Sequence, residues 1–319
     1  MSRRSDYYTS EYGNQFFGES YRERRANARH LRRVKEQRRC FVIALGFLMI
    51  FLAVGGTSIK VGSIVWQYCA ARKLYDLAAD EYVKESKNDI KKDKVGVIEI
   101  VKLSGNDSKD VPEWAKYVSV DAKSMNLEFP EAVGWLYFED GTISYPIMHS
   151  GNNDKYMRTA YNGKKSVGGA IFMDGADRRD FSDGHMLIYG HNMKDRSMFG
   201  NLRKYRKEEY CLEHMYFQVI TPSGKDRYQI FSANTIGENE NVYTVLREQD
   251  PNLSTFVNRE ILLGKKPIFD VNISSSDQIM SLVTCCEPGY RFVVSAVKVD
   301  HIDDNNMTVN AASAKVAVK

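Results

Sequence analysis

Residues 41–59 carry no charged side chain. As an α-helix, this run would be about 28 Å long, which is close to the thickness of the hydrocarbon core of a bilayer. A cleaved signal peptide normally has a shorter apolar region and a short basic leader, whereas a helix buried in a protein core would show a polar face. We therefore predict a transmembrane helix over residues 41–60, with a signal peptide and a buried core helix as the alternatives.

Basic residues gather on the N-terminal side of this segment. Residues 1–40 hold 11 Lys and Arg against 5 Asp and Glu, whereas the rest of the chain holds 34 against 36. Because positively charged flanks stay in the cytoplasm, residues 1–40 are predicted to be a basic cytoplasmic tail. The remainder of the chain should lie outside the cell membrane, which the chain crosses once. Since the excess of positive charge lies in this tail and the rest of the chain is slightly acidic, no nucleic-acid partner is expected.

Beyond the apolar run, the sequence divides into two further parts. Residues 61–94 place apolar side chains near helical spacing and end in a polar stretch, so they are predicted to form a helical stalk or linker, or a helix packed on the next domain. From residue 95 to 319, short apolar runs alternate with turn residues, which favours a domain built mainly from β-strands. The predicted strands are 97–103, 133–138, 143–148, 170–173, 185–189, 216–221, 228–236, 279–285 and 292–299.

The predicted fold class is thus mainly β. We expect a closed antiparallel barrel of about eight strands, or a sandwich, with short helical insertions near residues 197–209 and 252–263. The sequence shows no internal repeat and no metal-type spacing such as CxxC or HExxH. No metal or organic cofactor is therefore expected.

Two of the five cysteines, Cys285 and Cys286, are adjacent at the end of a predicted strand. A vicinal disulfide would force an unfavourable geometry on the intervening peptide, so a nucleophilic thiol is the interpretation to pursue. Such a thiol reacts as the thiolate and needs a histidine or another cation nearby. Because neighbouring residues of a strand point to opposite faces, only one of the two cysteines can face a given cleft.

Two candidates could supply that cation. Five histidines lie in the predicted outer domain, and His191 is favoured because it follows a strongly apolar strand and a glycine. Arg291 follows Cys285 by six residues across a Pro-Gly turn. If the two strands pair, Arg291 stands opposite Cys285, where a guanidinium would stabilise a thiolate or a developing oxyanion. An ordinary solvent-facing arginine is the alternative. The other four histidines are His149, His185, His214 and His301.

Three motifs resemble those of the sortase family. SLVTC, which ends at Cys285, and RFVVSAVKV, which begins at Arg291, are similar to the sortase cysteine and arginine motifs, with Ser281 in place of the usual Thr. LIYGHNM, which contains His191, resembles the histidine motif. The stretch 134–174, the helical N-terminal extension and the long insertion 237–277 are similar to class B sortases. The resemblance covers about residues 95–299.

The resemblance implies an activity and a role for each residue. Sortases are cysteine transpeptidases that cut a sorting signal of a secreted protein and join the new carboxyl end to an amine. Cys285 is then the nucleophile, His191 the general acid and base, and Arg291 the group that holds substrate or oxyanion. Cys286 is expected to be inert or to tune oxidation. Glu287 stands where some class B members have an acidic residue.

The resemblance also implies partners and a location. These are secreted proteins with a sorting signal, a peptidoglycan precursor or pilin as the amine acceptor, and the membrane of a Gram-positive cell, reached through residues 41–60. Two alternatives to a transpeptidase are compatible with the same sequence. One is a membrane-tethered adhesin or receptor whose β domain only binds, and the other is a hydrolytic cysteine peptidase on the same scaffold.

Overall fold

The computed structural model describes residues 60–85, 112–116, 118–265, 267–303 and 316–317, and scattered helical positions between residues 35 and 57. The chain divides into two compact units, Met1–Val65 and Trp66–Lys319. Within these described residues, no helix is long and apolar enough to cross a bilayer. The predicted transmembrane segment 41–60 lies mostly outside them, and so does the predicted strand 97–103.

The second unit begins within a helix that ends at residue 82. Tyr75, Ala78 and Tyr82 are buried in the main core, at a spacing that places them on one helical face. The hydroxyl of Tyr75 donates to the Gly169 carbonyl over 2.5 Å, and Tyr82 donates to Glu128 over 2.5 Å. These residues of the helix therefore pack against the domain that follows. Trp66 and Leu77, two further apolar residues of this helix, are exposed.

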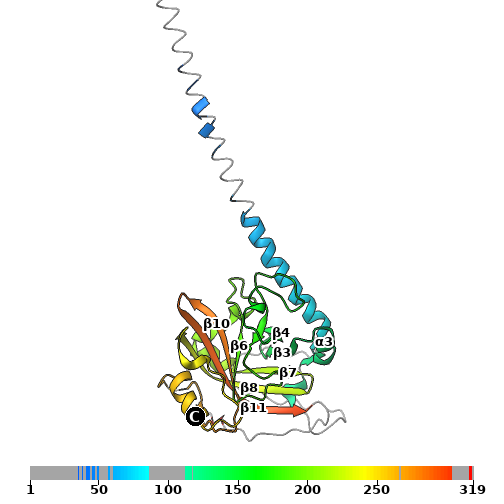
Figure 1. Ribbon diagram of the computed structural model, residues 1–319, viewed down its shortest axis with the longest axis vertical. Helices are drawn as coiled ribbons and strands as arrows, with labels where there is room; N and C mark the ends of the chain where they lie inside the picture. Colours follow the sequence, from blue (N-terminus) through cyan, green and yellow to red (C-terminus); the bar gives the residue numbers. More distant parts are fainter. Residues whose placement is uncertain are drawn as a thin grey trace, which may run out of the picture. The chain divides into compact units, whose positions relative to one another are not determined.

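Eight strands close into a barrel in the order β10-β11-β8-β7-β3-β4-β5-β6, which Figure 1 shows in part. This confirms the predicted mainly-β barrel. The predicted bounds of β6 and β7 are correct, while β8 and β11 are longer than predicted because they pair along almost their whole length. The barrel strands are β3 Ala132–Phe138, β4 Ser144–Met148, β5 Ile171–Met173, β6 His185–Tyr189, β7 Tyr216–Thr221, β8 Gly224–Gly237, β10 Ile279–Glu287 and β11 Tyr290–Asp303.

Short elements fill the connections, and the two predicted helical insertions are confirmed, each as a pair of short helices. Before the barrel come β1 Val83–Glu85, α2 Glu113–Lys116, β2 Val118–Val120 and α3 Ala122–Glu128. Between strands lie the short helices η1 Lys155–Met157, η2 Phe199–Arg206, α4 Glu208–Glu213, η3 Asn241–Tyr243, α5 Leu253–Phe256 and η4 Val257–Ile261. Two small sheets join β1 with β2, and β9 Asp270–Val271 with β12 Val316–Ala317.

The barrel is mostly antiparallel, and two of its pairings are parallel. Strand β4 runs parallel to β5, and β6 runs parallel to β10. Parallel neighbours need a long crossover, which residues 149–170 provide for the first pair and the whole segment 190–278 for the second. The second pairing matters most for function, because it brings the C-terminal ends of β6 and β10 to the same edge of the barrel.

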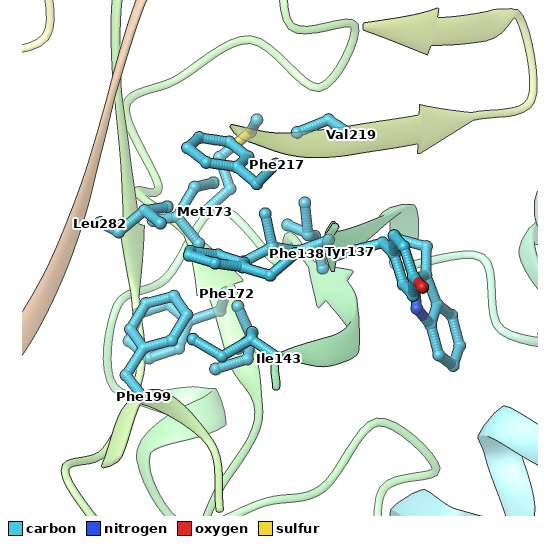
Figure 2. Close-up of a cluster of buried hydrophobic side chains, with 14 of the residues drawn as sticks. Tyr137, Phe138, Ile143, Phe172, Met173, Phe199, Phe217, Val219 and Leu282 are labelled. Atoms are coloured by element: carbon cyan, nitrogen blue, oxygen red, sulfur yellow. The ribbon is translucent and has the colours of Figure 1, made fainter. Parts of the chain in front are cut away.

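Aromatic side chains from three neighbouring strands form the centre of the core. Phe138 of β3 stacks on Phe217 of β7 with ring centroids 5.2 Å apart, and Phe217 stacks on Tyr228 of β8 at the same spacing. Each stacked pair is also a direct cross-strand pair, an arrangement that stabilises sheets. Figure 2 shows Phe138 and Phe217 among Ile143, Phe199 and Leu282. Side chains from β3, β7, η2 and β10 therefore share one core.

Strand β10 is buried on both of its faces. Met280 and Leu282 point into the main core, whereas Ile279 and Val283 belong to a second apolar cluster, which is covered by the insertion 237–277. This explains why the sequence of β10 reads as a continuous apolar run rather than an alternating one. Every residue from Ile279 to Thr284 is buried, and exposure begins at Cys285.

A buried polar network crosses β6, β10 and β11. His185 is fully buried, with Nδ1 2.7 Å from the Thr244 carbonyl and Nε2 2.9 Å from the Ser281 hydroxyl. The Ser295 hydroxyl lies 2.7 Å from that of Ser281. Because a carbonyl can only accept, Nδ1–H donates to Thr244 and Nε2 accepts from Ser281. Burial lowers the pKa of His185 to about 4, which keeps the ring neutral.

Protonation of His185 is expected to make stability depend on pH. The ordinary histidine pKa is 6.5, so between about pH 6.5 and pH 4 the unfolded chain binds a proton that the folded chain excludes. Stability should fall as the pH is lowered through this window, by about 3 kcal/mol at its lower end. Denaturant titration of the wild type and of His185→Gln at pH 7 and pH 5 measures the effect.

The comparison between the wild type and His185→Gln separates the contribution of His185 to the pH dependence from that of other titrating groups. Burial raises the pKa of Asp177 to about 8, and this carboxyl contributes the opposite dependence to both proteins. The wild type should therefore lose more stability than His185→Gln between pH 7 and pH 5. Equal losses in the two proteins would contradict the prediction.

Candidate active site

Cys285 is the first exposed residue of β10 after six buried ones. The strand is fixed up to this point, because β6 and β11 hydrogen-bond to its two edges and apolar clusters cover its two faces. Its thiol is free and exposed. The fold thus presents Cys285 to solvent from a rigid base, as expected for a positioned nucleophile.

A β-bulge separates the two adjacent cysteines. Cys285 pairs with Arg291 across the ladder and Glu287 pairs with Tyr290, so Cys286 has no opposite residue. Cys286 is only partly buried and packs against the main core, on the side of Leu282, whereas Cys285 is exposed. The two thiols therefore occupy different environments, as strand alternation predicts. Glu287 is exposed.

His191 lies just beyond the end of β6, the parallel neighbour of β10. Its Nε2 is 2.7 Å from the Met157 carbonyl. Because that carbonyl accepts, Nε2 carries the hydrogen of the neutral ring, and Nδ1 keeps the lone pair. Within the part of the chain that the structure describes, Nδ1 has no hydrogen bond. The imidazole is thus oriented by one nitrogen and able to exchange a proton through the other.

Three hydrogen bonds tie the backbone around His191 to that around Cys285. Gly190 N–H donates to the Val283 carbonyl over 3.1 Å, and the Thr284 hydroxyl donates to the Gly190 carbonyl over 2.7 Å. The Asn192 side chain donates to the carbonyl of Cys285 itself over 2.7 Å. The histidine and cysteine segments are therefore fastened together at neighbouring strand ends.

Gly190 is required for this close approach. A Cβ at this position would lie 2.5 Å from the Ile171 side chain and 2.7 Å from that of Phe199. Both neighbours are fully buried core residues that cannot move aside cheaply. The glycine before His191 therefore allows β6 to end directly against the core.

Arg291 stands opposite Cys285 in the β10–β11 ladder, as the sequence predicts. Directly opposed residues of an antiparallel pair share a face, with Cβ atoms about 5 Å apart. The guanidinium forms an ion pair with Glu238 over 3.0 Å and donates to its neighbour's carbonyl, that of Tyr290, over 3.1 Å. Arg291 is therefore held by partners instead of pointing freely into solvent. Glu238, at the start of the insertion, orients the Arg291 side chain.

Asn192, the Met157 carbonyl and Glu238 were not predicted from the sequence. Asn192 directly follows His191, and its position within the histidine motif was the available signal. Arg203 in turn holds Asn192, donating to its side-chain oxygen over 3.2 Å. Met157 contributes only its backbone carbonyl, and Glu238 lies in an insertion. The residue type therefore gave no sign that either position belongs to the site.

The other histidines lie elsewhere. His185 is the buried core residue described above, and His149 is also buried, with its pKa lowered by burial. His214 and His301 stand near the carboxylates of Asp140 and Asp226. Among the described residues, no group of three or more His, Cys, Asp or Glu is arranged to hold a metal ion.

Comparison with known proteins points to one family. A family model of the sortase domain matches residues 136–299. Sortase B of Listeria monocytogenes is 32% identical over 167 residues, which are 52% of this chain and 65% of the relative. Sortase B of Staphylococcus aureus is 27% identical over 172 residues, or 53% of this chain and 69% of the relative. The chain thus spans about two thirds of the length of these relatives.

Solved structures agree with this result. A Bacillus anthracis protein described as similar to sortase B superimposes with a TM-score of 0.55 at 25% identity, covering 72% of this chain and 96% of that one. A substrate complex of Staphylococcus aureus sortase B superimposes with a TM-score of 0.51 at 26% identity, covering 56% and 84%.

The environments of the cysteines predict an order of alkylation. Cys285 is exposed, Cys286 is partly buried and Cys211 is buried, and burial raises the pKa of Cys211 to about 11. Iodoacetamide should therefore react with Cys285 first and with Cys211 last. Tandem mass spectrometry of quenched time points separates the adjacent positions.

Exposed Cys69 serves as the internal control for this experiment. A nucleophilic Cys285 should react faster than Cys69 at neutral pH, since exposure alone favours both. Faster labelling of Cys286 than of Cys285 would contradict the assignment of the two thiols.

Proposed function

The chain belongs to the sortase family, and from that premise we propose that it is a membrane-anchored cysteine transpeptidase of the class B type. It cleaves a C-terminal sorting signal of secreted proteins after Thr and transfers the acyl group to an amine of a cell-wall precursor or pilin. One observation carries the proposal. An exposed thiol ends a strand held on both sides, with an arginine directly across the ladder and a histidine at the end of the parallel neighbour.

The first half-reaction forms a thioester. The Cys285 thiolate attacks the carbonyl carbon of the signal's Thr, a C–S bond forms, and the C–N bond breaks. His191, whose Nδ1 has taken the proton of the Cys285 thiol, gives that proton to the departing amine, as a general acid does. The Met157 carbonyl fixes the ring while this proton moves, in the role that a third group has in nucleophile–base pairs.

The second half-reaction reverses these roles. An incoming amine attacks the thioester carbon, His191 removes its proton, and the C–S bond breaks to release the Cys285 thiolate. Arg291 stabilises the oxyanion of each tetrahedral intermediate or holds the backbone of the signal. Its partner Glu238 sets the direction of the guanidinium. The outcome is exchange of one amide bond for another, without a net oxidation or hydrolysis.

The proposed function also includes a membrane anchor. We assign residues 41–60 as the anchor, with residues 1–40 in the cytoplasm and the catalytic domain, 95–319, outside. The apolar side chains of Phe41, Val42, Ile43, Leu45 and Met49 are exposed at their described helical positions, which supports this assignment. An anchored enzyme meets a membrane-held signal and a lipid-linked amine at a high effective concentration.

Formation of an amide in the presence of an amine tests the function. The full chain, a panel of sorting-signal peptides and a glycine or diamine acceptor should give a ligated product, detected by mass. Cys285→Ala should give none and Cys286→Ala most of the wild-type yield, because Cys285 is exposed whereas Cys286 packs against the main core. His191→Ala should lower the rate by at least about a hundredfold. Cleavage without ligation would indicate a hydrolytic peptidase, and no cleavage of any signal would favour a binding domain.

The planar fork of Arg291 should be needed for the rate. Arg291→Lys keeps the charge and loses the bidentate geometry, so kcat/KM should fall on the order of a hundredfold. Glu238→Gln serves as the matched control, because it removes an exposed ion pair worth little stability and keeps a hydrogen-bond acceptor for the guanidinium. Wild-type kinetics in Arg291→Lys would rule out the proposed role.

A further inference from the structure

A polar cavity of about 350 Å³ lies beside the loop that follows His191. The helix that ends at residue 82 forms one wall through Arg72, Tyr75 and Asp76. Residues 195–198 also line the cavity, and β4 and η2 contribute Tyr145 and Lys204. No step of the proposed mechanism uses this cavity.

The wall formed by residues 195–198 is tied to His191. The His191 carbonyl accepts from Met193 N–H over 3.1 Å and from Phe199 N–H over 3.0 Å, so the loop closes on the histidine. Met198 N–H donates to the Tyr145 hydroxyl over 3.1 Å. Arg196 and Met198 have φ of 68° and 51°, a conformation that these residue types rarely adopt and that persists only where surrounding contacts impose it.

The wall formed by the helix is also linked to His191. Tyr75 donates to the Gly169 carbonyl. The backbone of Gly169 is packed against the Met157 carbonyl, since a Cβ on Gly169 would lie 2.8 Å from that oxygen. The same carbonyl accepts from His191 Nε2. The loop beside the cavity is thus bonded to the backbone of His191, and Tyr75 is linked through Gly169 to the carbonyl that holds the imidazole.

Charges of both signs line this cavity. Among the described residues, Arg72, Arg196 and Asp76 form neither an ion pair nor a side-chain hydrogen bond. Asp195 accepts only from nearby Ser197, and Lys204 lies over the Tyr210 ring. An apolar ligand would leave these charges unpaired, and a purely anionic one would face two carboxylates. A peptide with free carboxylate and ammonium groups satisfies both signs.

We propose that this cavity binds the peptide part of the amine acceptor, a short peptide that carries free carboxylate and ammonium groups. The inference rests on the proposed transpeptidase function and adds a substrate site to it. Arg72 and Arg196 bind the carboxylates of this peptide, and Asp76 binds an ammonium group. A peptide held there lies against the loop that closes on the His191 carbonyl, and His191 is the residue that must deprotonate the incoming amine.

The test compares three acceptors in the same reaction of the full chain with a sorting-signal peptide. The first is a synthetic tetrapeptide with a free N-terminal ammonium group, one free lysine amine and two free carboxylates. The second is the same tetrapeptide with both carboxylates amidated, and the third is hydroxylamine. Arg72→Gln combined with Arg196→Gln should raise the KM of the carboxylate peptide roughly tenfold relative to that of hydroxylamine. Lys194→Gln, an exposed change in the same loop but outside the cavity, is the matched control.

A second measurement does not depend on turnover. Calorimetry of the carboxylate peptide with the Cys285→Ala protein should show saturable binding that weakens to the same extent when both arginines are replaced. Equal effects of the arginine changes on peptide and hydroxylamine, or a raised KM for the sorting signal instead, would overturn the cavity assignment. Absence of any hydroxamate from the wild type would refute the transpeptidase function itself.

Discussion

The parallel pairing of β6 with β10 is the constraint on which the rest of the site depends. It places the C-terminal ends of two strands, far apart in sequence, at one edge of the barrel. The hydrogen bonds of Gly190, Thr284 and Asn192 then fasten those ends to each other. Without this pairing, Cys285 would still face Arg291 across a hairpin, but nothing would bring the histidine segment to it.

Burial gives that edge its rigidity. Apolar clusters cover both faces of β10, and the His185, Ser281 and Ser295 network crosses beneath the site, so the strand is held until the residue before the thiol. Buried hydrogen bonds of this kind favour one register, because a slipped register would leave polar groups unpaired. The serine found where the family usually has threonine belongs to this network, and its hydroxyl supports the fold rather than the chemistry.

Sequence patterns predicted those parts that local chemistry specifies. Apolar runs between turn residues located most barrel strands, and the Pro-Gly turn indicated the pairing of Cys285 with Arg291. The parallel pairings escaped because they depend on long crossovers, whose path no local pattern encodes. The bulge at Cys286 escaped because apolar periodicity does not register an unpaired residue. The Met157 carbonyl escaped because every residue has one, and only the fold decides which carbonyl meets the imidazole.

Glu238 belongs to two parts of the structure at once, the insertion that covers β10 and the ion pair with Arg291. This residue opens the insertion that covers β10, and it also holds the guanidinium of Arg291. A change in the length or path of that segment would move the cover of β10 and the ion-pair partner of Arg291 together. The packing of β10 and the direction of the guanidinium opposite Cys285 therefore depend on one stretch of the chain.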